Sequence, residues 1–363
     1  MSYKLILNFK TVSKCGIIQL IYYGLLYTYT ERMTVNIMIE NTEKNRYIFG
    51  IDIGGTACKL GLFHEDGTLL EKWQIPTDRA NGGMNVFTDL AAAVDSKLEE
   101  KSINREDVIG IGAGVPASIS GEGVVQKCPA LGWSNFNVAD KITEVIGFPA
   151  VCGNDANLAA SGEAWKGANH SYSDVVFVTL GTGVGGGIIC NGKILQGAHG
   201  CSGELGHIKV NPAETREDGC GGHGCLQQYA SATGIANLAE EALTARGDEA
   251  KGTYLYGRIK VNAKNVFDGA KKGDEICLDV VDKFGEILGR ALAGICVVFD
   301  PEVVIIGGGV SAAGDILINA VRKHYVEWAF PPCADMEFRL ASLGNDAGIY
   351  GCAKMVIDEL TEL

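Results

Sequence analysis

Short apolar runs alternate with segments of helical periodicity along this chain, and the alternation predicts a mixed α/β protein. Two apolar hairpins are expected at 47–63 and 175–189, with further strands at 69–75, 108–115, 150–152 and 303–306. Apolar residues recur every three or four positions, as in amphipathic helices, within 86–98, 230–245, 276–298, 312–326 and 347–360. Because the second half repeats the order of the first, the class is α/β with a duplicated unit.

Both hairpins have turns rich in glycine and threonine. Glycine accepts a positive φ and lets the backbone approach a ligand closely, and backbone N–H groups gathered in a turn form an anion site. Asp52 enters the first turn. Two such turns on similar hairpins therefore suggest a duplicated domain that binds the phosphate chain of a nucleotide from both sides.

A dinucleotide-binding fold is the alternative for the second turn. Gly181, Gly183 and Gly186 match the G-x-G-x-x-G pattern, which requires a helix directly after the loop. Here an apolar run is followed by Asn191-Gly192 and a second apolar run, which is a hairpin signal. The element after the loop is therefore expected to be a strand, which disfavours this alternative.

Composition narrows the class of protein and its partners. The chain has 363 residues, enough for two domains, and 31 basic against 44 acidic residues give a net charge of −13. An acidic surface argues against non-specific nucleic-acid binding and against anionic membranes. Most of the 12 cysteines lie within apolar segments, as free thiols do in a reducing compartment, so a cytoplasmic location is expected.

Residues 1–45 are expected to form an extension outside the core. The apolar run Cys15–Tyr29 is shorter than the roughly 20 residues that a membrane-spanning helix needs. Lysines precede this run as in a signal peptide, but no small-residue cleavage site follows it. Because Met33 and Met38 offer later starts, we expect an upstream extension of the reading frame.

Asp155 is the candidate general base. It follows the short strand 150–152 at the junction of the two units, and ligands of open α/β sheets bind at the carboxyl ends of strands. The alternative is a structural role, in which Asp155 caps a helix at 156–165.

A second group has the composition of a metal site. Cys220 and Cys225, with His207 upstream, are typical of tetrahedral zinc, and Asp218 or His223 could supply the fourth ligand. Two free thiols in a glycine-rich loop remain the alternative.

Taken together, these motifs resemble those of the ROK (repressor, ORF, kinase) sugar kinases, most closely the bacterial glucokinases. The similarity covers roughly 47–353 and rests on segments in this order: Asp52–Thr56, Pro129–Trp133, Gly153–Asn157, Leu180–Gly187, Gly203–His207, Gly224–Gln227 and Ile306–Gly309. The resemblance implies an actin/hexokinase-like (ribonuclease H-like) duplicated fold of two domains with a cleft between them. A small domain would span 46–160, completed by the C-terminal helix 347–363, and a large domain 161–346.

The resemblance also implies roles for individual residues. ATP and Mg²⁺ would be bound by Asp52, Gly54, Gly55, Thr56, Lys59, Thr182, Gly183, Gly308 and Gly309. Asp155 would accept the proton of the sugar 6-hydroxyl, while Asn154, Glu204, His207 and Gln227 would bind the sugar. A structural Zn²⁺ would be held by His207, Asp218, Cys220 and Cys225, and the protein would be a homodimer.

This chain departs from the pattern of the family in two places. The usual first Cys of the metal loop is Asp218, and the usual Glu after the Cys-Leu pair is Gln227. Gln can hydrogen-bond a sugar without the added strength of a charge, so Gln227→Glu is expected to tighten hexose binding. Both departures fall on the sugar side of the site.

The expected function is ATP-dependent phosphorylation of a hexose 6-hydroxyl, most simply that of glucose. N-acetylmannosamine, N-acetylglucosamine, fructose or allose stay open as substrates, and polyphosphate stays open as the donor. A sugar-sensing regulator is the alternative from another class. Regulators of this family carry a helix-turn-helix domain ahead of the kinase-like fold, and residues 1–45 are too few and insufficiently basic for one.

Overall fold

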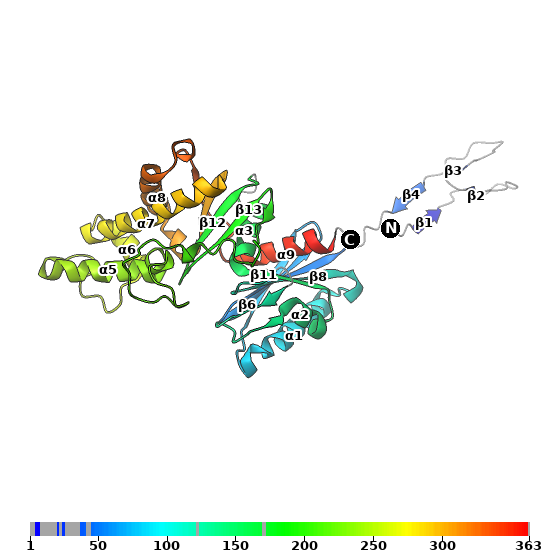
Figure 1. Cartoon of the computed structure of the whole chain (residues 1–363). Helices are drawn as coiled ribbons and strands as arrows, with labels where there is room; N and C mark the ends of the chain where they lie inside the picture. The colour runs from blue at the N-terminus through cyan, green and yellow to red at the C-terminus, as the bar shows by residue number, and fades with distance from the viewer. Residues whose placement is uncertain are drawn as a thin grey trace. The chain divides into compact units, whose positions relative to one another are not determined.

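The computed structural model describes residues 45–120, 123–168 and 172–361, and the backbone of four short strands before them. The chain divides into two compact units, Met1–Asn45 and Arg46–Leu363. In the first unit, β1 (Lys4–Leu7) pairs with β4 (Ile37–Glu40), and β2 (Leu20–Ile21) pairs with β3 (Gly24–Leu25), both antiparallel (Figure 1). Met33 and the remainder of the apolar run Cys15–Tyr29 lie outside the described residues.

The second unit contains two five-stranded sheets. The first is built from β5 (Tyr47–Ile53), β6 (Ala57–His64), β7 (Leu69–Pro76), β8 (Val108–Val115) and β11 (Ala150–Asn154), in the order β11-β8-β5-β6-β7. The pairs β5–β6 and β6–β7 are antiparallel, whereas β5–β8 and β8–β11 are parallel. A small pair, β9 (Val124–Val125) with β10 (Phe136–Asn137), lies apart from this sheet.

The second sheet repeats the topology of the first. Its strands are β12 (Val175–Leu180), β13 (Val184–Cys190), β14 (Lys193–Ile194), β15 (Val303–Gly307) and β16 (Glu337–Leu340), in the order β14-β13-β12-β15-β16. Two antiparallel pairs are again followed by two parallel ones. The predicted duplication is therefore confirmed at the level of strand order and direction.

The helices cover both faces of each sheet. They are α1 (Asn85–Lys101), α2 (Val138–Ile146), α3 (Asp155–Lys166), α4 (Gln227–Ala230), α5 (Ala232–Arg246), α6 (Ala263–Ala270), α7 (Glu275–Phe299), α8 (Asp315–Trp328) and α9 (Ala347–Leu360). The helix predicted from residue 312 begins later, because Gly309–Ala313 forms a 3₁₀ turn and Gly314 has a φ of 78°.

Five apolar clusters among the described residues hold these layers together. On the first sheet, α1 and α2 cover one face and α9 the other, where Ile349 and Val356 pack among Ile48 and Phe63. On the second sheet, α3 covers one face and α5, α7 and α8 contribute to the large core on the other. Helices α3 and α9 pack directly on each other between the two sheets (Figure 1).

Gly112 on β8 is required for the packing of α9 against the first sheet. A Cβ on Gly112 would lie 2.0 Å from the carbonyl oxygen of Cys352, so only glycine lets α9 approach the sheet this closely. The sequence alone gave no sign of this contact, because its two partners are far apart along the chain.

The turn between β13 and β14 decides the alternative fold. Asn191 and Gly192 have φ values of 52° and 74°, as a two-residue hairpin requires, and β13 follows the second glycine loop. A strand in this position excludes the dinucleotide-binding arrangement, as predicted. Within the described part of the chain, no helix has both the length and the apolar composition that a membrane span requires.

Candidate active site

The first glycine loop, Gly54–Thr56, joins β5 to β6 and is fixed by its own hydrogen bonds. The Gly54 N–H donates to the Ala57 carbonyl at 3.1 Å, and the Thr77 hydroxyl donates to the Gly54 carbonyl at 2.7 Å. Gly55 lies against Ala130, where an added Cβ would be 3.5 Å from that of Ala130. The loop is therefore a preformed turn.

Asp52 lies on β5 just before this loop, opposite Lys59 on β6. The Lys59 ammonium is 3.1 Å from Asp52 Oδ2, and both side chains keep some exposure to solvent. The N-terminus of α9 also faces this carboxylate, because a Cβ on Gly348 would lie 3.0 Å from Asp52 Cγ. Asp52 is thus an accessible carboxylate with one cationic partner.

The second glycine loop, Gly181–Gly183, joins β12 to β13 and is held from below by α5. The Ala232 N–H donates to the Gly181 carbonyl at 2.8 Å, and the Thr233 hydroxyl donates to the Thr182 carbonyl at 3.2 Å. These contacts leave Thr182 itself exposed. The start of α5 therefore sets the position of the second loop.

Asp155 lies two strands away from Asp52 along the same sheet edge. In the register of the sheet, Asp52 is opposite Gly114 on β8, and Gly114 is opposite Gly153 on β11. Asp155 follows β11 directly as the first residue of α3. The parallel pairing of β5, β8 and β11 is what brings the two carboxylates to one edge.

The structure resolves the helix-cap alternative for Asp155. The cap of α3 is Asn154, whose Oδ1 accepts from the Asn157 N–H at 3.0 Å, whereas Asp155 accepts only from the neighbouring Ala156 N–H at 2.8 Å. Because Asn154 also donates to the Ala117 carbonyl at 3.2 Å, its amide is oriented by the protein. Asp155 is therefore not needed to start the helix.

Burial, together with the negative charges of Asp52 and Glu204, raises the pKa of Asp155 to about 7. Glu204 comes from the other half of the chain, after β14, and accepts from the Ser118 hydroxyl at 3.2 Å. The two halves of the unit therefore meet beside Asp155. A carboxylate with a pKa near neutrality is suited to accepting a proton at physiological pH.

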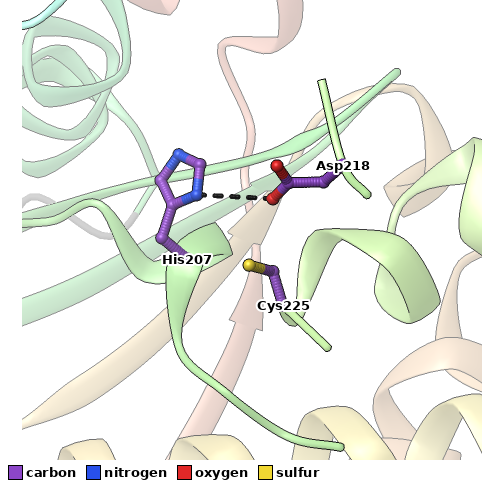
Figure 2. A group of neighbouring side chains, drawn as sticks. All are labelled: His207, Asp218 and Cys225. Atoms are coloured by element: carbon purple, nitrogen blue, oxygen red, sulfur yellow. Dashed lines mark ion pairs between the residues drawn. The ribbon is translucent and has the colours of Figure 1, made fainter. Parts of the chain in front are cut away.

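The side chains of three predicted metal ligands lie close together, although His207 comes from the turn Leu205–His207 and the other two from the segment after it (Figure 2). The donor atoms of His207, Asp218 and Cys225 all lie within 4.8 Å of one another, and His207 Nδ1 is 3.7 Å from Asp218 Oδ2. Ligands of tetrahedral zinc stand about 3–4 Å apart, so imidazole, carboxylate and thiol in this arrangement fit a zinc ion. Burial raises the pKa of the Cys225 thiol, so metal binding would release a proton.

Cys220 and Gln227 are placed differently from expectation. The Cys220 N–H donates to Asp218 at 2.9 Å, but the residue is exposed and stands outside the group of three donors. Gln227, expected to contact a sugar, donates its amide to Asp218 Oδ2 at 2.9 Å. Burial alone would raise the pKa of Asp218, yet the hydrogen bonds from Gln227, Cys225 and the loop backbone outweigh it and hold that pKa well below its usual range.

Gly308 and Gly309 follow β15 at the mouth of a cavity. Gly308 has a φ of 80°, and a Cβ there would lie 2.6 Å from the Leu180 backbone. The cavity, of about 330 Å³, is lined by Gly181 of the second loop, by Gly309 and by α6 side chains such as Phe267 and Lys264. Its size and apolar lining suit a small organic group.

Several residues of this region were not predicted from the sequence. Lys209 donates to Cys225 Sγ at 3.1 Å, Ser118 orients Glu204, and Phe267 lines the cavity. Lys209 has a weak local signal, since it follows His207 by two residues. Ser118 and Phe267 have none, because each meets the site only through tertiary packing.

Comparison with known proteins agrees with this architecture. The ROK family profile matches residues 48–359. A glucokinase of Halalkalibacterium halodurans is 41% identical over 309 residues, which is 85% of this chain and 94% of the relative, and an N-acetyl-D-glucosamine kinase of Haemophilus influenzae is 30% identical over 85% and 99%. The crystal structure of a ROK glucokinase from Streptomyces griseus, in complex with glucose and AMPPNP, has a TM-score of 0.70 at 32% identity and covers 85% of this chain and 98% of that one.

Two sheets of identical topology, each with a glycine loop between its first two strands in the sequence, define an α/β protein of the actin/hexokinase-like class. Within that class, the profile match over most of the chain identifies the family. This chain belongs to the ROK family.

Proposed function

We propose that this protein is an ATP-dependent hexose kinase that phosphorylates the 6-hydroxyl of glucose. The observation that supports it most directly is Asp155, a carboxyl with a pKa of about 7 at the edge where the two halves meet. The similarity to glucokinases over 85% of the chain supports the choice of glucose. Phosphoryl transfer depends mainly on alignment and charge stabilisation, which two phosphate-binding loops can supply.

Asp155 accepts the proton of the sugar hydroxyl as the hydroxyl oxygen bonds to the γ-phosphorus of ATP, while the bond from that phosphorus to the β,γ-bridging oxygen breaks and ADP leaves. Near pH 7 a substantial fraction of this carboxyl is ionised, and proton transfer to it is then favourable. Asn154 and Glu204 flank Asp155 and are held in place by Ala117 and Ser118. They form hydrogen bonds with the sugar hydroxyls and so fix the distance between the 6-hydroxyl oxygen and the γ-phosphorus.

The nucleotide lies across the two glycine loops. The backbone N–H groups of Gly55 and Thr56 and of Thr182 and Gly183 bind its phosphates, because those of Gly54 and Gly181 already donate within their own loops. The base enters the cavity beside Gly308 and Gly309. Asp52 is the residue that would hold Mg²⁺, which neutralises the charge of the phosphates when bound. Lys59, paired with Asp52, adds a second positive charge at this end.

Zn²⁺ would be held by His207, Asp218 and Cys225, whose donors fit it. When bound, it would fix the loop that carries His207 and so orient the sugar-binding edge of this residue. No step of the transfer passes through this ion. Its role is structural support.

A matrix of sugars against phosphoryl donors tests the proposal. Purified protein should phosphorylate glucose with ATP and Mg²⁺ at a higher kcat/KM than N-acetylglucosamine, N-acetylmannosamine, fructose or allose, and ATP should exceed polyphosphate. The N-acetylhexosamine kinases are the second candidate, because a kinase of that specificity is 30% identical over 85% of this chain. A higher kcat/KM for N-acetylglucosamine would favour it, and no transfer to any sugar would contradict the kinase itself.

The pH dependence follows from the same carboxyl. Protonated Asp155 cannot accept a proton, so kcat/KM for glucose should fall about tenfold per pH unit below an apparent pKa of about 7. Above that pKa it should be level until another group titrates. The measurement is initial rate at limiting glucose and saturating ATP from pH 5 to 9; a flat profile down to pH 5 would exclude this role.

Three expectations stay predictions. The small domain is proposed to span 46–160 with the C-terminal helix, and the large domain 161–346. The homodimer is likewise a proposal, and it does not affect the chemistry described above.

A further inference from the structure

The two residues that depart from the pattern of the resembling family form a hydrogen bond to each other. Gln227 Nε2 donates to Asp218 Oδ2 at 2.9 Å. The Asp218 side chain is only 3% exposed, and its other oxygen accepts from the Cys220 and Gly222 N–H groups at 2.9 and 2.7 Å. In this buried place an amide donor matches a carboxylate acceptor, whereas a second carboxylate would not.

The other end of the Gln227 amide reaches the second glycine loop. A Cβ placed on Gly183 would lie 3.0 Å from Gln227 Oε1, so the oxygen faces the tip of that loop. Gln227 is the first residue of α4, immediately before the segment that carries Ala232 and Thr233 to the same loop. The Gln227 side chain therefore contacts both the metal loop, 218–225, and the phosphate loop Gly181–Gly183.

We propose that Asp218 and Gln227 are a matched pair, in which Gln227 is a positioning residue that ties the metal loop to the loop Gly181–Gly183 instead of binding sugar. The proposal rests on the proposed function only for its consequence for ATP. The pair itself is a property of the folded chain without substrates.

The hydrogen bond to Asp218 changes the effect expected of Gln227→Glu, which the sequence alone predicted to tighten hexose binding. Glutamate at 227 has no amide hydrogen to donate, so the hydrogen bond to the buried Asp218 Oδ2 would be replaced by two acceptors facing each other. The loop that contains Asp218 and the tip at Gly183 would separate. Weaker binding of ATP is then expected, in place of tighter binding of hexose.

A double-mutant cycle tests the pair. Its variants are Q227E, D218N and D218N/Q227E, of nearly equal volume, and the double variant restores one donor and one acceptor with their direction exchanged. Q227E should lower Tm by about 5 °C, and the double variant should melt above Q227E. The deciding quantity is the coupling free energy of the cycle, because any weaker metal binding caused by D218N affects D218N and D218N/Q227E alike and cancels in that difference.

The exposed Gln126 provides the control, since Q126E adds the same charge without removing the buried hydrogen bond that Gln227 makes to Asp218, and should leave Tm unchanged. The Kd of AMPPNP should rise on the order of tenfold in Q227E and recover in D218N/Q227E, whereas the KM for glucose should change less. Additive changes in Tm would contradict the proposed pairing of Asp218 with Gln227. So would a rise in the KM for glucose alone that the double variant does not reverse. The Tm measurement needs no substrate. If the double variant regains Tm but the wild type phosphorylates no sugar, the proposed function is wrong and the pairing of Asp218 with Gln227 still holds.

Discussion

Asp155→Asn is expected to lower kcat for glucose phosphorylation by about 10²–10⁴ while the KM for glucose changes little. Asparagine has nearly the same volume as aspartate but cannot accept the proton of the attacking hydroxyl. The cap of α3 is supplied by Asn154, so the helix should form as before. Steady-state kinetics of the two proteins at pH 7.5 make the measurement.

The same substitution should stabilise the fold at alkaline pH. The folded pKa of Asp155, about 7, lies above its ordinary value, so the folded form holds this proton more tightly than the unfolded chain. That contribution to stability is present at low pH and is lost as pH rises toward 7. Asparagine does not ionise, and the variant should therefore melt about 3 °C or more above the wild type at pH 8, with no gain near pH 4.

Asp315 gives a matched control, because it is also the first residue of a helix, α8, but is exposed. Asp315→Asn should leave kcat unchanged and lower stability slightly through the lost interaction with the helix dipole. A structural role for Asp155 would make both variants behave alike. Near-normal turnover of Asp155→Asn would remove it from proton transfer altogether.

Gly351→Ala is expected to be the most destabilising single-methyl change in the contact between the two sheets. A Cβ on Gly351 would lie 1.7 Å from the carbonyl oxygen of Leu158, and one on Gly162 would lie 2.1 Å from that of Ala347. Helices α3 and α9 therefore approach through glycines on both sides. The neighbouring atoms are backbone and cannot rotate away, so the helices must separate, at a cost of about 3 kcal/mol or more.

Thermal unfolding should register this cost as a Tm about 6–10 °C lower. Gly294→Ala is the control, because Gly294 is exposed within α7 and an added Cβ there meets nothing within 4 Å. Alanine should stabilise that helix by roughly 0.5–1 kcal/mol, since it restricts the unfolded chain. Equal effects of the two substitutions would mean that α9 does not pack on α3 as closely as described.

Local patterns determined the elements of this fold. Residues 108–115 predicted a buried strand and are fully buried as β8, and Asn191-Gly192 predicted a hairpin turn that both φ values confirm. Such features depend on the conformational preferences of a few consecutive residues and on the period of apolar positions. The repeated order of elements also pointed to the duplication that the two sheets display.

The candidate site was visible from the sequence only as separate segments. The spacing of Gly153–Asn157 placed Asp155 at a strand end but did not distinguish a base from a helix cap. That distinction needed the cap hydrogen bond of Asn154 and the charges of Asp52 and Glu204 around the carboxyl. Likewise, the loop composition suggested Cys220 as a ligand, whereas the geometry brings His207, Asp218 and Cys225 together.

By itself, the sequence determined the strands, the helices, the two glycine turns and the residue types near the junction, because these are written in consecutive residues. Only the tertiary structure decided which carboxyl is buried, that Gln227 faces Asp218 and Gly183, and why Gly112 and Gly351 cannot be larger. Desolvation, charge and steric contact act through space, and here they join residues that lie about 300 positions apart in the chain.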